Sequence, residues 1–175
     1  MKNLNLIIFL IIINNSFAQV KDSIKIVPDF RINRLHQTKI YKNLRVGLGI
    51  QKSFVSEIGY SKMKHISSCT GFFSKTYYSS IEYVPKTPNY EDVFGLKIGL
   101  EYNLSIVAVG LETKYQTDFD NKDIVVTPKI GLGFGYFNLF YGYNITTNKN
   151  PFPSVGNHQF SLIFNIPITS RDISE

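Results

Sequence analysis

The sequence is poor in cysteine, in tryptophan and in long apolar runs. Its 175 residues include one cysteine and no tryptophan. The lone Cys69 excludes a disulfide within the chain and a metal site built from clustered cysteines. The apolar run near the N-terminus, residues 6–13, is too short to cross a bilayer as a helix. We therefore expect no metal, no cofactor and no membrane-spanning helix.

The N-terminus has the pattern of an export signal. Lys2 precedes the apolar run, and Ser16-Phe17-Ala18 supplies the small residues of a cleavage site. We interpret residues 1–18 as a cleaved signal peptide, with an uncleaved anchor or a buried strand as the alternative. Residues 19–43 are then expected to form a periplasmic extension, and residues 169–175 a C-terminal tail.

The charge is basic but dispersed. The formal net charge is +6, and its cations stand singly rather than in a basic run. This spacing argues against nucleic acid as a partner. An anionic membrane surface fits the charge better.

The dominant pattern is an alternation of apolar and polar residues with a period of two. In VFGLKIGLEYNLS, residues 93–105, every second residue from Phe94 to Leu104 is large and apolar. This period predicts β-strands that have two chemically different faces. Eight strands are predicted, at residues 44–51, 53–64, 71–84, 93–103, 106–116, 124–135, 138–145 and 158–168.

The predicted connections alternate in length. Long polar loops follow the third, fifth and seventh strands, at 85–92, 117–123 and 146–157, whereas Leu104-Ser105 and Tyr136-Phe137 are tight links. This alternation places the long loops at one end of a closed sheet. The short first loop and the longer HISSCTG link after the second strand fit less well.

The polar face of these strands carries glycine and charge together. Ten of the 12 glycines lie on it. It also carries a balanced set of four cations and four carboxylates, namely Arg45, Glu57, Glu82, Lys97, Glu101, Glu112, Lys114 and Lys129. Glycine makes room for long side chains inside a narrow eight-stranded barrel, so this face is predicted to be the interior.

The apolar face is then predicted to contact lipid. Aromatic residues gather toward the strand ends, as interfacial girdles do, and strands of about 11 residues suit a tilted membrane strand. The sequence therefore predicts an all-β fold, an eight-stranded antiparallel up-and-down transmembrane β-barrel over residues 44–168. The alternative is a soluble, lipocalin-like barrel with the apolar face inward, which binds a small apolar ligand.

Taken together, the export signal, the eight alternating strands, the glycine-and-charge face and the unequal loops resemble the small OmpA/OmpX-like outer-membrane barrels of Gram-negative bacteria, of the Bacteroidota type. The resemblance covers residues 44–168 and implies an outer-membrane location among lipids. The chain departs from the family at its end, where TSRDISE replaces a terminal aromatic residue.

Strand register predicts how the interior charges pair. A two-residue turn at Leu104-Ser105 places Lys97 opposite Glu112, and a turn at Tyr136-Phe137 places Phe140 opposite Gly133. Buried charges must be paired, so the interior is expected to be a packed plug without a wide pore. A gate in which the same charges exchange partners is the alternative.

An enzymatic function is not expected. His65-Ile66-Ser67 has the spacing of a lipid hydrolase pair, and His158 is a second histidine, but this short motif arises easily by chance. The leading hypothesis is a monomeric, structural or surface-interaction barrel that works through its long loops. Exposed loop side chains expected to contact a partner are Tyr90, Phe119, Pro151, Phe152 and Pro153.

Overall fold

A computed structural model describes residues 37–68, 71–88, 91–148 and 152–173. The predicted signal peptide, residues 19–36 of the predicted extension, Cys69, Tyr90 and Pro151 lie outside these ranges. Within them, no helix is long and apolar enough to cross a membrane.

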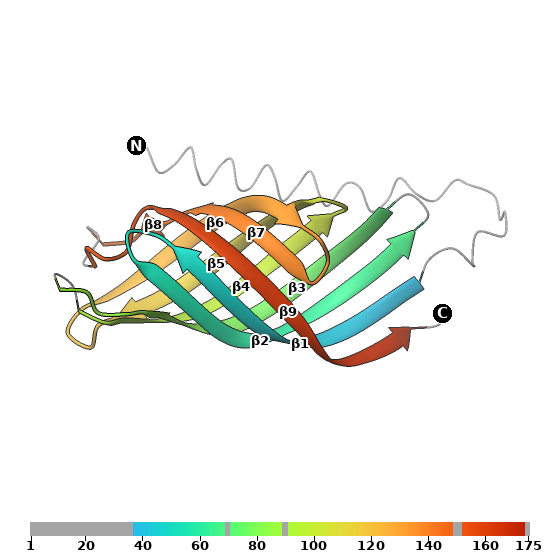
Figure 1. Ribbon diagram of the computed structural model, residues 1–175, viewed down its shortest axis with the longest axis horizontal. Helices are drawn as coiled ribbons and strands as arrows, with labels where there is room; N and C mark the ends of the chain where they lie inside the picture. Colours follow the sequence, from blue (N-terminus) through green and yellow to red (C-terminus); the bar gives the residue numbers. More distant parts are fainter. Residues whose placement is uncertain (1–36, 69–70, 89–90, 149–151, 174–175) are drawn as a thin grey trace. The chain divides into compact units, whose positions relative to one another are not determined.

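The described chain is all-β. Its strands are β1 (Gln37–Ile50), β2 (Phe54–Ser68), β3 (Gly71–Val84), β4 (Val93–Leu104), β5 (Val107–Thr117), β6 (Lys122–Gly133), β7 (Phe137–Tyr143), β8 (Ile145–Thr146) and β9 (His158–Ile173). They form one antiparallel sheet in which the strands from β1 to β7 each pair with the next along the chain, β8 pairs with β6, and β9 pairs with β7. The pairs β5–β6 and β1–β9 close the sheet into a ring (Figure 1).

A proline explains why nine strands occupy eight positions in this ring. β7 and β8 both pair with β6 in one continuous register, interrupted where Pro128 would face Tyr143. Proline has no N–H to donate to the ladder, so the pairing lapses there. β7 and β8 are thus two segments of a single interrupted strand that lies along one edge of β6.

Three strands run further than the alternation predicted. β1 begins at Gln37 rather than at residue 44, β2 continues to Ser68, and β9 continues to Ile173. In these extensions several outward positions carry polar residues, namely Thr38, Lys42, Thr169 and Arg171, so the apolar signal weakens before the hydrogen bonding stops. Residues 37–43 of the predicted extension therefore belong to β1.

The connections separate into two ends of the ring. At one end, here called the turn end, Ser68 pairs with Gly71, Leu104 with Val107, and Phe134 donates its N–H to Phe137 at 2.7 Å. The link after β2 is therefore two residues long, and the prediction of a longer link there is wrong. The long connections 85–92, 118–121 and 147–157 lie at the other end, here called the loop end (Figure 1).

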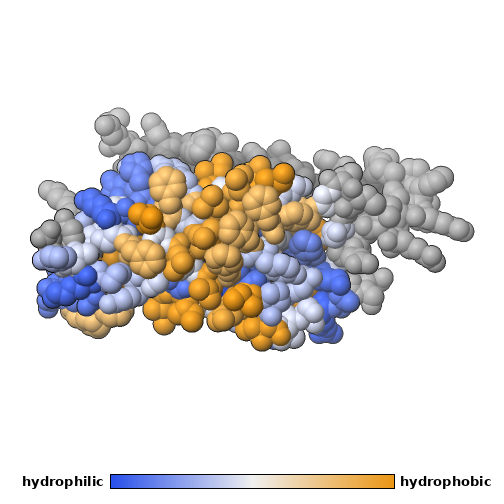
Figure 2. All heavy atoms as spheres, viewed as in Figure 1, coloured by the Kyte–Doolittle hydropathy of each residue, from blue (hydrophilic) through white to orange (hydrophobic). Residues whose placement is uncertain are grey.

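The two faces of the sheet differ as the alternation predicted. Inward side chains are mainly polar and buried, whereas large apolar side chains on the outer face remain exposed, with Ile98 at 60%. An apolar belt encircles the ring and includes Leu48, Ile58, Ile81, Leu96, Ile98, Leu111, Ile130, Leu132, Phe160 and Ile166. On the face in Figure 2 this belt lies between hydrophilic ends. An inward apolar face, which the lipocalin-like alternative requires, is not what the structure has.

Candidate functional site

All eight residues of the predicted charge set lie inside the ring. They come from six consecutive strands, β1 to β6, and none is more than 6% exposed. Four cations and four carboxylates leave this group without net charge.

Arg45 of β1 is the most fully engaged cation. Its Nε lies 2.6 Å from Glu57 Oε1, and its two terminal nitrogens reach the Glu101 carboxylate at 2.7 and 3.2 Å. The guanidinium carbon also lies 3.6 Å from the centre of the Tyr78 ring. A bidentate pair and ring stacking together fix this side chain in one orientation.

Two lysines continue the charge pairing from Glu57. Lys97 Nζ contacts Glu57 Oε2 at 2.7 Å and also pairs with Glu82. Lys114 Nζ then lies 3.8 Å from Glu82 Oε2 and 3.4 Å from Glu112 Oε1. Glu82 therefore forms ion pairs with two lysines that lie directly opposite each other on β4 and β5.

Lys129 of β6 completes the circuit. Its Nζ lies 2.8 Å from Glu112 Oε2, 2.8 Å from Glu101 Oε1 and 2.8 Å from the Tyr78 hydroxyl. The Tyr78 hydroxyl donates to Glu112 Oε2 at 2.6 Å. Tyr78 thus contacts Arg45 through its ring and contacts Glu112 and Lys129 through its hydroxyl.

The eight charges form a closed cycle in which the sign alternates. In order, the cycle runs Arg45, Glu57, Lys97, Glu82, Lys114, Glu112, Lys129, Glu101 and back to Arg45. Each member contacts two members of opposite charge. Burial of a charge costs several kcal/mol unless it is paired, and the cycle meets that condition without leaving an excess charge. We call this arrangement the charge cycle.

The predicted pairing of Lys97 with Glu112 is wrong. Leu104 pairs with Val107, so the two-residue turn is Ser105-Ile106, one residue later than expected. Lys97 therefore lies opposite Lys114. The shift keeps Ile106 out of the interior, where the expected register would have placed it against Asn103.

The predicted pairing of Phe140 with Gly133 is wrong for the same kind of reason. The turn between β6 and β7 is Gly135-Tyr136, where Gly135 has a φ of +76°. Phe140 lies opposite Gly131 instead, buried to 1% exposure. The atoms nearest to a Cβ added at Gly131 are backbone atoms of Leu139 and Phe140, so the expectation that the Phe140 ring fills the space beside a glycine is not met.

The sequence analysis did not single out Tyr78, although the alternation in β3 assigns it to the inward face. It alternates inward with Ser80 and Glu82 in β3, and its cross-strand neighbour is Gly99. A Cβ at Gly99 would lie 2.4 Å from both Cζ and the hydroxyl oxygen of Tyr78. The absence of a side chain at Gly99 is what admits the tyrosine ring.

Replacing Gly99 with alanine is expected to lower the free energy of unfolding by about 1–3 kcal/mol, because the added methyl group overpacks the interior against Tyr78. Gly95→Ala is the matched control, since its Cβ would lie no closer than 3.3 Å to a neighbour, the Glu82 side chain. Urea unfolding in detergent micelles measures both. Equal losses in the two variants would contradict this account of Gly99.

Neutral polar side chains add further hydrogen bonds to the charge cycle. Gln159 of β9 accepts a hydrogen bond from Lys114 Nζ, and Asn144 accepts another at 3.2 Å. Gln116 donates to Glu82 Oε1 at 3.0 Å. A cavity of about 10 Å³ beside Glu57 and Gln159 has room for on the order of one water molecule.

The loop end of the interior is covered by an apolar cluster. Phe152 and Val155, from the connection before β9, pack with Val55, Val84 and Val93. Phe152 is only 2% exposed, so the prediction that it is an exposed contact residue is wrong. The alternation pattern gave no signal here, because the residue lies in a loop that folds back over the ring.

The same connection is held at both of its ends. Asp123 Oδ1 accepts hydrogen bonds from the Thr147 hydroxyl at 2.7 Å and from the Asn148 N–H at 3.1 Å. Asn144 donates its side-chain amide to the Gly156 carbonyl at 2.7 Å. By contrast, Phe119 is 82% exposed, as the sequence predicted.

The histidines of the hydrolase alternative have aromatic neighbours. The His65 ring stacks on Phe72 and meets Tyr41 edge-on, with ring centroids 5.5 and 6.3 Å away. His158 Nδ1 lies 2.7 Å from the Tyr141 hydroxyl on the outer face. In the described ranges, no group of three or more histidine, cysteine, aspartate or glutamate side chains is placed to hold a metal ion.

Fold and site together define a class of protein: a closed antiparallel ring, apolar outside, with a buried and neutral charge cycle inside. Searches against protein-family models, curated proteins and solved structures find no match to this chain.

Proposed function

We propose that the chain is an integral outer-membrane β-barrel, similar to the small OmpA/OmpX-like barrels, whose apolar belt faces lipid. The observation that carries this proposal is the inverted distribution of polarity: charged side chains are buried and large apolar ones are exposed. Soluble monomers rarely expose contiguous apolar patches larger than a few hundred Å². A lipid environment removes that cost because the belt then has an apolar solvent.

The aromatic side chains support the same orientation. Outward tyrosine and phenylalanine residues border the belt, with Tyr83, Phe94 and Tyr115 toward the loop end and Tyr77 toward the turn end, all exposed by 37–52%. Such girdles lie at the two lipid–water interfaces of membrane barrels. The predicted signal peptide supplies the export that an outer-membrane location needs, with the turn end periplasmic and the long loops extracellular.

A packed interior favours a role at the surface rather than in transport. The charge cycle fills the middle of the barrel and the Phe152 cluster covers the loop end. The barrel is then a rigid membrane anchor that presents loops, of which 118–121 exposes Phe119. Loops on rigid scaffolds commonly carry binding functions.

Fractionation and gel mobility test this proposal. The full chain should be recovered with outer membranes, should require detergent for extraction, and should migrate faster on a gel before boiling than after it. Reconstituted in planar bilayers, it should show no steady conductance. Recovery as a detergent-free soluble monomer would overturn the membrane assignment, and a steady conductance would overturn the closed interior.

A further inference from the structure

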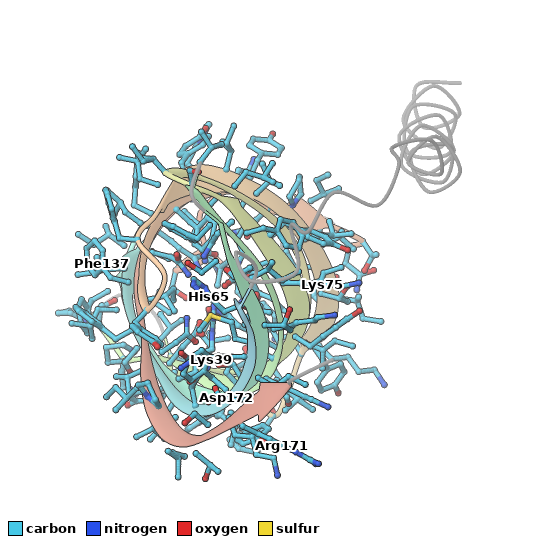
Figure 3. All side chains as sticks on the ribbon, turned by 90° about the vertical axis from the view of Figure 1, so that its right-hand side faces the viewer. Lys39, His65, Lys75, Phe137, Arg171 and Asp172 are labelled. Carbon is cyan, nitrogen blue, oxygen red and sulfur yellow. The ribbon has the colours of Figure 1, made fainter. Side chains whose placement is uncertain are left out.

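Cations that are scattered in the sequence meet on the outer face of the turn end. They come from four neighbouring strands, in the order β9, β1, β2 and β3. We call this group the basic patch; it consists of Arg171, Lys42, Lys62, Lys64 and Lys75. In Figure 3, Arg171 and Lys75 project outward from the rim of the ring.

Strand register places like charges directly against each other in the basic patch. Lys42 is opposite Lys62, and Lys64 is opposite Lys75. Arg171 extends the row, because it pairs with Ile40, which in turn pairs with Lys64. Directly opposite side chains have Cβ atoms about 4.5–5.5 Å apart, and like charges there are destabilising. An anion bound across these pairs would remove that penalty.

The described part of the turn end holds little negative charge to balance them. Its single carboxylate, Asp172, lies 3.3 Å from the inward-facing Lys39 (Figure 3). The five cations of the basic patch, together with Lys39 and Asp172, give the described part of this end a net charge of +5. In the described part of the loop end there are three lysines and five carboxylates, Glu91, Asp92, Asp118, Asp120 and Asp123, which gives −2. The asymmetry lies along the axis of the ring, so the two ends face different chemical surroundings.

The basic patch also adjoins apolar and aromatic surface. Lys75 Nζ lies 4.9 Å from the Tyr77 ring centre and 5.3 Å from that of Tyr102. Tyr77 is 52% exposed and is the cross-strand neighbour of Lys62. A ligand that combines an anionic group with a hydrocarbon chain could therefore contact the lysines and the belt together.

We propose that the basic patch binds the headgroups of anionic phospholipids in the membrane leaflet at the turn end. This inference rests on the proposed insertion of the barrel in a bilayer. The phosphodiester lies against the lysine pairs of β1, β2 and β3, while the acyl chains run along the aromatic and apolar belt. Each lysine near an anionic surface contributes modestly to the binding free energy. Several lysines together favour anionic lipid over zwitterionic lipid.

Lipid retention by the reconstituted full chain tests the proposal. The protein is inserted into bilayers of phosphatidylcholine that contain a minor fraction of phosphatidylglycerol, extracted, and its bound lipids are counted by native mass spectrometry. The wild type should retain phosphatidylglycerol in preference to phosphatidylcholine. A Lys62→Gln, Lys64→Gln, Lys75→Gln variant should lose that preference by about tenfold or more at low ionic strength.

A matched variant supplies the control. Lys52→Gln, Lys86→Gln, Lys122→Gln makes the same change in charge at the loop end and should retain phosphatidylglycerol as the wild type does. Lys62→Arg, Lys64→Arg, Lys75→Arg keeps the charge and should also retain it. Equal retention of both lipids by the wild type, or equal losses in the two glutamine variants, would overturn the proposal. Failure to insert into pure phosphatidylcholine would instead overturn the membrane assignment.

Discussion

Replacing Arg45 with methionine is expected to lower the free energy of unfolding by about 3–5 kcal/mol, because the change leaves four buried carboxylates with only three buried cations. Arg45 is fully buried and contacts both Glu57 and Glu101. Its removal opens the charge cycle and leaves a net negative charge inside the barrel. The stacking on Tyr78 is lost as well. Urea unfolding in micelles, followed by gel mobility without boiling, measures the loss.

Two further variants test whether the loss comes from the missing buried charge of Arg45. Lys122→Met removes an exposed lysine at the loop end and should change stability by no more than about 0.5 kcal/mol. Adding Glu101→Gln to Arg45→Met restores electrical balance, so the double variant should lose less than the sum of the two single variants, by about 0.5–3 kcal/mol. Strict additivity would show that the two residues do not act through the charge cycle.

Placing arginine in the middle of the apolar belt should be nearly as costly in a bilayer. Ile98 lies near the centre of β4 and is 60% exposed. If it faces lipid, Ile98→Arg should lower the free energy of unfolding in vesicles by about 2–4 kcal/mol. If the chain were a soluble protein, the same change at an exposed position would cost little.

Leu104→Arg is the matched control, since Leu104 lies on the same face of the same strand and is 54% exposed. It is six residues nearer the turn end, a distance of about 20 Å along the strand at about 3.3 Å per residue. Near the interface the cost of arginine falls to about 0–1 kcal/mol. A loss at Ile98 no larger than the loss at Leu104 would contradict a lipid-facing belt.

What the sequence could predict follows from the period of two. Alternation assigns each residue of a strand to one of two faces, so the eight charged residues could be assigned to one face together from parity alone. Parity does not set the register, because a shift of two residues between paired positions preserves every face assignment. That is why Lys97 was predicted opposite Glu112 and lies opposite Lys114.

The alternation pattern does not predict where strands end or how loops pack. Two of the three outward residues of β1 before Leu44, Thr38 and Lys42, are polar, so the pattern fades although the hydrogen bonding continues to Gln37. Phe152 was judged by its place in a long polar loop, whereas its burial depends on contacts with Val84 and Val93, which are distant in sequence. Cross-strand neighbours such as Lys42 and Lys62 likewise become visible only once the register is known.

The origin of the charge cycle in β1 to β6 has a consequence for how the sheet closes. The strands that complete it, β7 and β9, contribute Phe140, Ile163 and neutral amides to the interior, and between residues 159 and 170 β9 has no ionisable side chain. The pairing of β9 with β1 therefore completes the ring without adding a charged side chain to the charge cycle. Six neighbouring strands supply all eight charges of the cycle, so the two remaining positions of the ring contribute shape rather than charge to its middle.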